Sequence, residues 1–437
     1  MEKNKMVAVV VAVMLVAVAA VGVILYLGSN GGDKEYDTGI LMVHGDYDYE
    51  FVPMDTDGVH AASAFYTAHG ISPPEGALGA STDINDWTLW VIPKGGSGWV
   101  AGGDPLNTIV SEHDGVAWSL TGNPPAISVD ANNISLFTLI GSKERIVCLS
   151  PSITEIMAAL GEDKIVGVDD WSDYPKSIAD NEDIKRVGSY WGEINFELIV
   201  AANPDLVISD GDAFGQDIVA NTLRDVGIQV LSISGHKGSI EGVCQNIHTI
   251  GLVTKTLDKA NELVKEIIGV SVALKEIVDD FGLEDRKVLV IMPPDPTTVL
   301  VAGEWGTMGS AIMTIGLEVA MGLETSWTPW PGISTETVLN DGSDAYFVIV
   351  MSLYMPFTYA DLAAHSVLGG IPAIQEGRVC IIDEGSRADS ILSRSGPGVM
   401  HVMGILGYLA TLDWSGITGG VTIGNDYMDY LDTLGVF

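Results

Sequence analysis

Two short segments of the sequence carry the same residue types at the same spacing. In each segment a tryptophan, Trp191 or Trp330, lies six residues before a glutamate, Glu197 or Glu336. An isoleucine lies three residues before each glutamate, a residue able to cap a helix lies two before it, and an aspartate that opens an apolar run lies eight after it. A spacing that repeats residue for residue predicts two structurally equivalent elements.

The chemistry that these segments could perform is recognition. Asn195 and Ser334 can cap free backbone N–H groups of a short helix, which places Glu197 and Glu336 in the first turn, where the helix dipole favours an acid. Each glutamate alone would be an ordinary first-turn acid. As an equivalent pair they predict two negative contact points for a symmetric partner. The tryptophans precede the helices in loops, where they either pack in the core or line a cleft for a small molecule.

Catalytic patterns are missing from the sequence. It contains no HExxH, GxSxG or P-loop motif. The adjacent acids Asp169 and Asp170 are expected to be solvated loop residues. A metal site in the first third of the chain stays open, but ordinary histidines are favoured there, at His44, His60, His69 and His113. The sequence therefore predicts no enzyme, no catalytic residue, no metal and no cofactor, with a metallohydrolase as the enzymatic alternative.

The charge of the chain excludes one class of partner. The 437 residues include 21 Lys and Arg against 58 Asp and Glu, which gives a net charge of −37. Such a surface repels nucleic acid. The three cysteines, Cys148, Cys244 and Cys380, each lie inside an apolar run and are expected to be buried free thiols.

The N-terminus contains an apolar segment. Residues Met6 to Leu27 form an unbroken run long enough for a helix to cross a bilayer core of about 30 Å. Lys3 and Lys5 precede the run, which predicts that everything after it is exported. A cleaved signal peptide is the alternative, and it also exports the body. No cysteine follows the run closely enough to carry a lipid, so we expect the helix itself to be the anchor.

The pattern of apolar residues changes along the chain. Residues 29–142 contain alternating and apolar runs that predict a small strand-rich domain with one short helix. After it, short Val/Ile/Leu runs alternate with helical patterns, which is typical of parallel sheets covered on both faces. One long helix is predicted from Lys255 to Asp280. The predicted parts are an anchor or signal segment 1–28, the strand-rich domain 29–142, an α/β lobe 143–254, a bridging helix 255–281 and a second α/β lobe 282–437.

Three stretches carry a resemblance to a known family: RIVCLSPSITEIMAALGEDKIVGVDDWSDYP, FELIVAANPDLVISD and HSVLGGIPAIQEGRVCIID. With these stretches in order, residues of about 143–412 resemble the helical-backbone class of periplasmic binding proteins, which deliver cobalamin, siderophores and haem to ABC importers. The resemblance implies an α/β fold of two Rossmann-like lobes bridged by one long helix, with ligand between the lobes. WTLWVIPKGGSGWVAGGDPLN and HDGVAWSLT are similar to the small C-terminal domain of transcobalamin-like proteins.

The resemblance also implies roles for particular residues. Glu197 and Glu336 match the glutamates that pair with arginines of the permease dimer, which works with its ATPase subunits. The similarity is greatest to cobalamin-binding members, whose ring-flanking aromatic residues match Trp171 and Trp330, and either Tyr190 or Trp191 would supply a third ring. The full set of predicted ligand contacts is Trp171, Tyr190, Trp191, Trp330, Pro331 and Arg387.

The expected ligand follows from charge. An anionic iron chelate is normally met by several Arg or Lys donors, which are scarce here, whereas a large amide-fringed macrocycle needs aromatic and polar contacts. Cobalamin or a related corrinoid is therefore favoured over an iron-siderophore or haem. The sequence predicts an extracytoplasmic substrate-binding protein anchored by residues 6–27, and the rival from another class is a surface adhesion or sensory module.

Overall fold

A computed structural model describes most of the chain from residue 38 to residue 428. Residues 46, 70–83, 97, 128–138, 190–191, 212–214, 234–237, 323–329, 354 and 393 are not described. The predicted anchor, Met6 to Leu27, lies outside the described residues, and none of the helices within them is long and apolar enough to span a membrane. The described chain forms two compact units, one of 38–235 with 244–265 and the other of 236–243 with 266–428.

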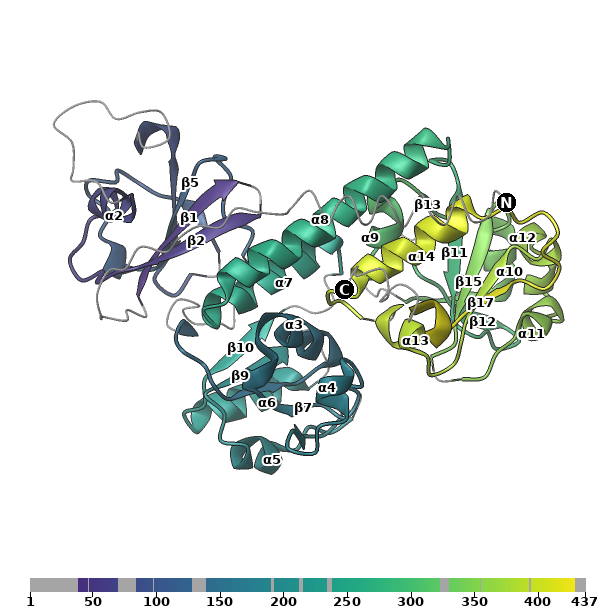
Figure 1. The fold of residues 1–437 in the computed structure, drawn as a ribbon, viewed down its shortest axis with the longest axis horizontal. Helices are drawn as coiled ribbons and strands as arrows, with labels where there is room; N and C mark the ends of the chain where they lie inside the picture. The colour runs from purple at the N-terminus through teal and green to yellow at the C-terminus, as the bar shows by residue number, and fades with distance from the viewer. Residues whose placement is uncertain are drawn as a thin grey trace. The chain divides into compact units, whose positions relative to one another are not determined.

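The first unit begins with a small mixed sheet, drawn in purple and blue in Figure 1, whose strand order is β2-β1-β5-β3-β4. Three apolar runs of residues 29–142, GILMV, DWTLWVI and GVAWSL, form β1, β3 and β5, whereas most of a fourth run, ISLFTLI, lies outside the described residues. Phe65, Trp87 and Trp118 fill the core between sheet and helix. The elements are β1 (Gly39–Gly45), β2 (Asp48–Pro53), α2 (Ala61–Ala68), β3 (Thr88–Pro93), β4 (Val100–Ala101) and β5 (His113–Ser119).

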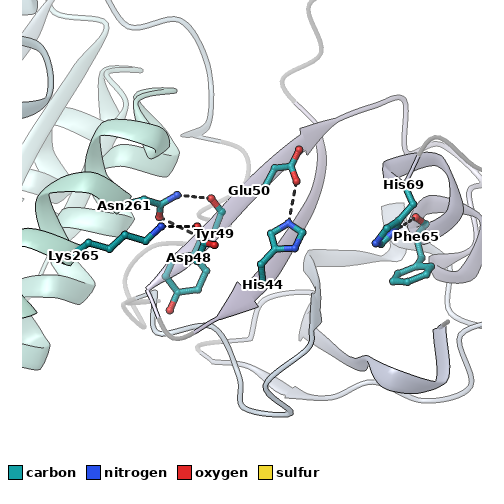
Figure 2. A network of polar contacts seen from close by, with 8 residues as sticks. All are labelled: His44, Asp48, Tyr49, Glu50, Phe65, His69, Asn261 and Lys265. Carbon is teal, nitrogen blue, oxygen red and sulfur yellow. Dashed lines mark hydrogen bonds and ion pairs between the residues drawn. The ribbon is translucent and has the colours of Figure 1, made fainter. Parts of the chain in front are cut away.

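The small sheet is joined to helix α8 (Leu257–Asp280) within the same unit, as Figure 2 shows. The side-chain amide of Asn261 accepts a hydrogen bond from the Tyr49 backbone N–H at 3.2 Å and donates one to the Tyr49 carbonyl at 2.6 Å. Lys265, one turn further along, lies 3.0 Å from Asp48. Because β2 is an edge strand, Asn261 satisfies backbone groups that would otherwise be unpaired.

This junction gives a prediction for Asn261→Ala. The change should leave both backbone groups of the buried Tyr49 without their partner, which costs about 2–4 kcal/mol of junction stability. Hydrogen exchange of the Tyr49 amide should accelerate by at least ten-fold. The neighbouring exposed residue supplies a matched control, Glu262→Ala, which should leave that exchange rate unchanged. Equal rates in both variants would contradict a stabilising role for Asn261.

The first unit also contains a five-stranded parallel sheet of order β10-β9-β6-β7-β8, which is called the first lobe together with its helices. Counted along the chain this order is 3-2-1-4-5 read from the β8 edge, which is the Rossmann arrangement. Its elements are β6 (Ile146–Cys148), α3 (Pro151–Gly161), β7 (Ile165–Val168), α4 (Lys176–Ala179), β8 (Lys185–Arg186), α5 (Phe196–Ala201), β9 (Leu206–Asp210), α6 (Gln216–Asp225), β10 (Val230–Ile233) and α7 (Ile240–Val253).

The second unit contains another five-stranded parallel sheet, of order β13-β11-β15-β16-β17, which is called the second lobe together with its helices. Its order along the chain is 2-1-3-4-5, the flavodoxin arrangement, so the expectation of two Rossmann-like sheets needs a correction here. In the first lobe three strands of the sheet, β6 to β8, form before the chain crosses to the other side of β6, whereas in the second lobe only β11 and β13 of the sheet form before it crosses to the other side of β11. Hydrophobic periodicity does not show where such a crossing occurs.

The strands and helices of the second lobe surround a fully buried central strand, β15. They are β11 (Lys287–Ile291), β12 (Thr298–Leu300), α9 (Thr307–Thr314), β13 (Glu318–Val319), β14 (Gly332–Ser334), α10 (Thr335–Asp341), β15 (Phe347–Met351), α11 (Tyr359–Ala363), α12 (Pro372–Gln375), β16 (Val379–Ile382), α13 (Arg387–Leu392), α14 (Val399–Thr411) and β17 (Val421–Ile423). The α/β class predicted from the sequence is confirmed.

Helix α8 carries the chain from the first unit into the second. It has 24 residues and begins at Leu257, two residues after the predicted start. Lys255 has a left-handed φ of 57°, which ends the preceding helix α7 and prevents one continuous helix. The division of the chain at residues 28, 142, 254 and 281 stays a prediction.

A cavity of about 560 Å³ lies at the amino ends of the second sheet. Arg286, Tyr346 and Arg378 each directly precede one of three strands, β11, β15 and β16. The Arg286 guanidinium lies 3.8 Å and that of Arg378 5.3 Å from the centre of the Tyr346 ring. Burial, and secondarily the nearby Arg378 charge, lowers the pKa of Arg286. Ligands of open α/β sheets bind at the opposite, carboxyl edge, so this cavity is not the candidate site.

The stacked cations predict a stability effect at Tyr346. Tyr346→Ala should destabilise the second unit by about 2–4 kcal/mol, because two cation–π contacts are lost and two guanidinium groups then face each other without the ring. Tyr346→Phe keeps the ring and should retain most of that stability. Urea unfolding of the three proteins tests this expectation, and similar midpoints for the Ala and Phe variants would contradict it.

Candidate functional site

The carboxyl edge of each parallel sheet is the place where this architecture binds ligands, at the point where strand order reverses. In the first lobe that point lies between β6 and β9. The buried Gln216 fills it, since its amide donates to the Leu149 carbonyl at 2.7 Å and accepts from the Asp210 backbone N–H at 2.7 Å. The candidate ligand-contacting residues of this lobe therefore lie further along the edge, after β7.

Trp171 stands on that part of the edge, three residues after β7 ends. Its ring is 39% exposed, and its Nε1–H donates to the Ser189 hydroxyl at 2.9 Å. Asp169 accepts from the Trp171 backbone N–H at 3.1 Å and from the Ser172 hydroxyl. The expectation that Asp169 is solvated is wrong: it is completely buried, because it organises this loop from within. The indole face is thus presented by an ordered loop.

Arg186 supports the same loop from the neighbouring strand β8. Its guanidinium donates to the carbonyls of Asp169 at 3.0 Å, Ser172 at 2.8 Å and Ala179 at 2.9 Å. Arg186 was not predicted from the sequence. Its three carbonyl acceptors are brought together only by the fold, so the residues next to Arg186 in the sequence give no sign of them.

Tyr190 and Trp191 lie outside the described residues, but the segment that carries them is described on both sides. Ser189 N–H bonds to the Glu193 carbonyl at 3.1 Å, and Gly192 N–H bonds to the Ser189 carbonyl at 3.0 Å. Trp171 bonds to Ser189, and the roles of Tyr190 and Trp191 stay predictions.

The two matched glutamates occupy equivalent places. Glu197 is the second residue of α5, and Asn195 caps that helix by accepting from the Leu198 N–H at 3.1 Å. Glu336 is the second residue of α10, and Ser334 accepts from the Thr337 N–H at 3.1 Å. Both glutamates are exposed. The repeat therefore encodes a capped helix with an outward acid in each lobe, as predicted.

Trp330 and Pro331 lead into a two-stranded antiparallel ribbon, β12–β14, on the second lobe. Pro331 accepts a hydrogen bond from the Val301 N–H at 3.2 Å, and both Trp330 and Pro331 are half-buried. Only strand β14 separates Trp330 from the helix that carries Glu336. The candidate ligand contact, Trp330, and the candidate docking acid, Glu336, thus lie on one continuous segment of the chain.

Arg387 begins α13, just beyond the carboxyl end of β16, and is partly buried. Its backbone N–H donates to the Asn425 side chain at 2.9 Å. Two residues on, the buried Asp389 accepts from the Leu353 N–H at 2.8 Å and from the Gly385 N–H at 3.3 Å. Asp389 therefore links the loops that follow the neighbouring strands β15 and β16, beside Arg387.

Asp389 was also not predicted from the sequence. Its backbone N–H bonds to the Ser386 hydroxyl at 3.3 Å, so a Ser three residues before an acid was a capping signal that could have identified it.

In the described part of the chain there is no cluster of metal-binding side chains, and the cysteines are buried. No three His, Cys, Asp or Glu side chains gather there in a way that could hold a metal ion. Cys148, Cys244 and Cys380 are buried free thiols, as expected, and burial raises the pKa of Cys148 and Cys380. Neutral, buried thiols are poor nucleophiles.

Comparison with known sequences gives consistent relatives. The chain is 30% identical over 209 residues to an uncharacterised ABC transporter substrate-binding lipoprotein of Bacillus subtilis, which covers 46% of this chain and 63% of that protein. It is 30% identical over 197 residues to a vitamin B12-binding protein of Salmonella paratyphi A, covering 45% and 68%. A cobalamin-binding protein of Halobacterium salinarum is 26% identical over 262 residues, covering 59% and 68%.

Solved structures show a likeness of fold. A periplasmic heme binding protein of Vibrio cholerae superposes with a TM-score of 0.52 at 23% identity, covering 61% of this chain and 99% of that one. Residues 146–385 match the family model described as periplasmic binding protein, which is more than half of the chain. On the sequence match, the relatives and the two parallel sheets together, this chain belongs to the periplasmic binding protein family.

Proposed function

We propose that this chain is the extracytoplasmic substrate-binding protein of an ABC importer, which captures cobalamin or a related corrinoid between its two lobes and delivers it to the permease dimer. One observation carries the importer assignment: Glu197 and Glu336 are exposed at equivalent, capped helix starts in two lobes. A two-fold permease that presents basic groups could contact both. Binding, and not turnover, is the proposed activity.

The proposed permease contact has an apolar component in the first lobe. Leu198 and Val200, on the same short helix as Glu197, are 40% and 42% exposed. In the second lobe the matched helix exposes Thr337 instead. Exposed apolar side chains beside an acid are typical of a surface that a protein partner covers.

Cobalamin is the proposed ligand because of the aromatic residues and the named relatives. Trp171 presents an exposed indole on the first lobe, and Trp330 lies on the ribbon of the second. Two relatives bear the names vitamin B12-binding and cobalamin-binding protein. Flat rings suit a flat macrocycle whose rim carries amides.

Haem or an iron-siderophore is the second candidate ligand, and Arg387 is the observation that favours it. Arg387 is placed at the carboxyl edge of the second sheet, where a guanidinium could pair with the carboxylates of an anionic ligand. Residues 6–27 are the proposed membrane tether, and the division into anchor, strand-rich domain, two lobes and bridging helix completes the proposed organisation.

Titration of the purified full chain in detergent tests the ligand. Cyanocobalamin, haemin and a ferric siderophore are each equilibrated with the protein by dialysis, and the bound ligand is measured from its own absorbance. We expect saturable binding of cyanocobalamin at one site and weaker binding of the anionic ligands. Tight haemin or siderophore binding without cyanocobalamin binding would overturn the corrinoid assignment and leave the family membership intact.

A further inference from the structure

Trp305 is a large exposed side chain that the repeat of tryptophans and glutamates does not include. Its ring is 42% exposed, although it lies in the second lobe only five residues after β12. It is the second residue before helix α9, at the carboxyl edge of the sheet, because the chain reaches it after β11 and the ribbon. Its exposed surface lies at the edge of the sheet where this architecture binds ligands, so it is available to contact one.

The ribbon β12–β14 brings Trp305 and Trp330 to the same end of one element. Leu300 pairs with Gly332, and Val301 bonds to Pro331 at 3.2 Å. The next position in this antiparallel register is Trp330, so Trp330 and the chain leading to Trp305 leave the ribbon together. The opposite end of the ribbon leads to α10 and Glu336.

The loop that presents Trp305 is held from two sides. A Cβ on Gly309 would lie 2.1 Å from the Gly303 carbonyl, and one on Gly238 would lie 2.6 Å from the Thr307 backbone nitrogen. Such close backbone approaches leave no room for the loop to shift inward. Gly306 has a φ of 116°, a conformation that other residues rarely adopt, directly after Trp305. Trp305 is therefore carried by a closely packed loop whose conformation depends on glycine.

The charge around this pair of rings restricts the ligand. Residues 298–307 include one acid, Glu304, and no Lys or Arg, and residues 330–334 include neither acid nor base. These two segments themselves therefore offer a polyanionic chelate a carboxylate and no cation. A flat macrocycle with an uncharged amide rim would meet apolar rings and backbone groups.

We propose that Trp305 and Trp330 together form an aromatic platform on the second lobe that contacts the face of a corrin-type macrocycle. This inference rests on the proposed function and extends it, because it assigns a ligand-contacting residue outside the repeat and a preference for uncharged over anionic rings.

The test compares the wild type with four variants by equilibrium dialysis, with cyanocobalamin and haemin as probes and detection by ligand absorbance. Trp305→Ala should weaken cyanocobalamin binding by about ten-fold, as should Trp330→Ala, which is the loss expected for a contact worth somewhat more than 1 kcal/mol. Trp305→Phe keeps a flat ring and should recover most of the affinity. Phe281→Ala is the matched control, since this exposed aromatic residue of the same unit lies in the amino-edge cavity.

Each outcome has a distinct meaning. Weakening by Trp305→Ala with recovery by Trp305→Phe, while the thermal unfolding temperature is unchanged, supports the platform. Wild-type affinity in Trp305→Ala, with Trp330→Ala impaired, overturns the platform and leaves the proposed function standing. A wild-type protein that binds haemin and not cyanocobalamin overturns the uncharged-ring preference. Binding of neither probe by the wild type rejects the proposed function itself, and with it the platform.

Discussion

Reversal of both exposed glutamates, Glu197→Arg with Glu336→Arg, should abolish ligand uptake through the permease while ligand binding to the purified protein stays at the wild-type level. Both side chains point outward from capped helix starts, so the substitutions change the surface and spare the core. Like charges placed in contact cost several kcal/mol in a protein interface, which corresponds to a loss of docking of about 100-fold or more.

The local folding effect of this double variant should be small. Asn195 and Ser334 still cap the helices, and the loss of a first-turn acid costs about 0.3–1 kcal/mol per helix. The measurement is transport of labelled ligand into proteoliposomes that contain the permease with its ATPase subunits. A net-charge control, Glu182→Arg with Glu284→Arg, changes two exposed acids that precede β8 and β11 at the amino edges and should preserve transport. Retained uptake in the Glu197→Arg/Glu336→Arg protein would refute the docking role.

Acid should destabilise the first unit through His248. This residue of α7 is completely buried, its ring centre lies 4.4 Å from that of Tyr49, and neither ring nitrogen has a hydrogen-bond partner among the described residues. Burial lowers the pKa of His248 to about 3. The Asn261 amide opposes that shift less strongly than burial drives it, and the charges of Lys265 and Asp48 act in opposite directions.

The direction of the pH dependence follows from this depressed pKa. An unfolded histidine takes up its proton near pH 6.5, whereas His248 in the folded protein does so only near pH 3. Between these values the unfolded state binds the additional proton, so the stability contribution is complete above about pH 6.5 and is lost as the pH falls towards 3. The total amounts to several kcal/mol, and more than 1 kcal/mol of it should be lost by about pH 5.

Urea unfolding of the first unit at pH 7.5, 6 and 5 measures this loss. In wild type the midpoint should fall with pH, and the fall should be clearly smaller in His248→Phe, which removes the titrating ring and keeps an aromatic side chain between Tyr47 and Tyr49. His44→Gln is the control, since His44 is partly exposed and bonds to Glu50, as Figure 2 shows. Parallel pH profiles for wild type and His248→Phe would contradict the assignment of this effect to His248.

The elements that depend on neighbouring residues were predictable from the sequence. Asn195 and Ser334 cap helices through contacts that span three residues, so the spacing that predicted the two glutamate-bearing helix starts is the spacing that forms them. The buried thiols and the alternation of apolar strands with helices follow equally from local composition. The start of α8 differed by two residues, because the left-handed φ of Lys255 has no signature in its residue type.

Only the tertiary structure decided which distant residues meet. Asn261 pairs with Tyr49 across 212 residues of sequence. Arg186 is aligned with two carbonyls of the Trp171 loop and with the last carbonyl of α4 only because β7 and β8 are neighbours. The sequence predicts a solvated acid at Asp169, whereas in the folded protein this side chain is buried. Periodicity records which face of an element is apolar, whereas strand order and the placement of polar side chains depend on contacts between segments whose separation along the chain is arbitrary.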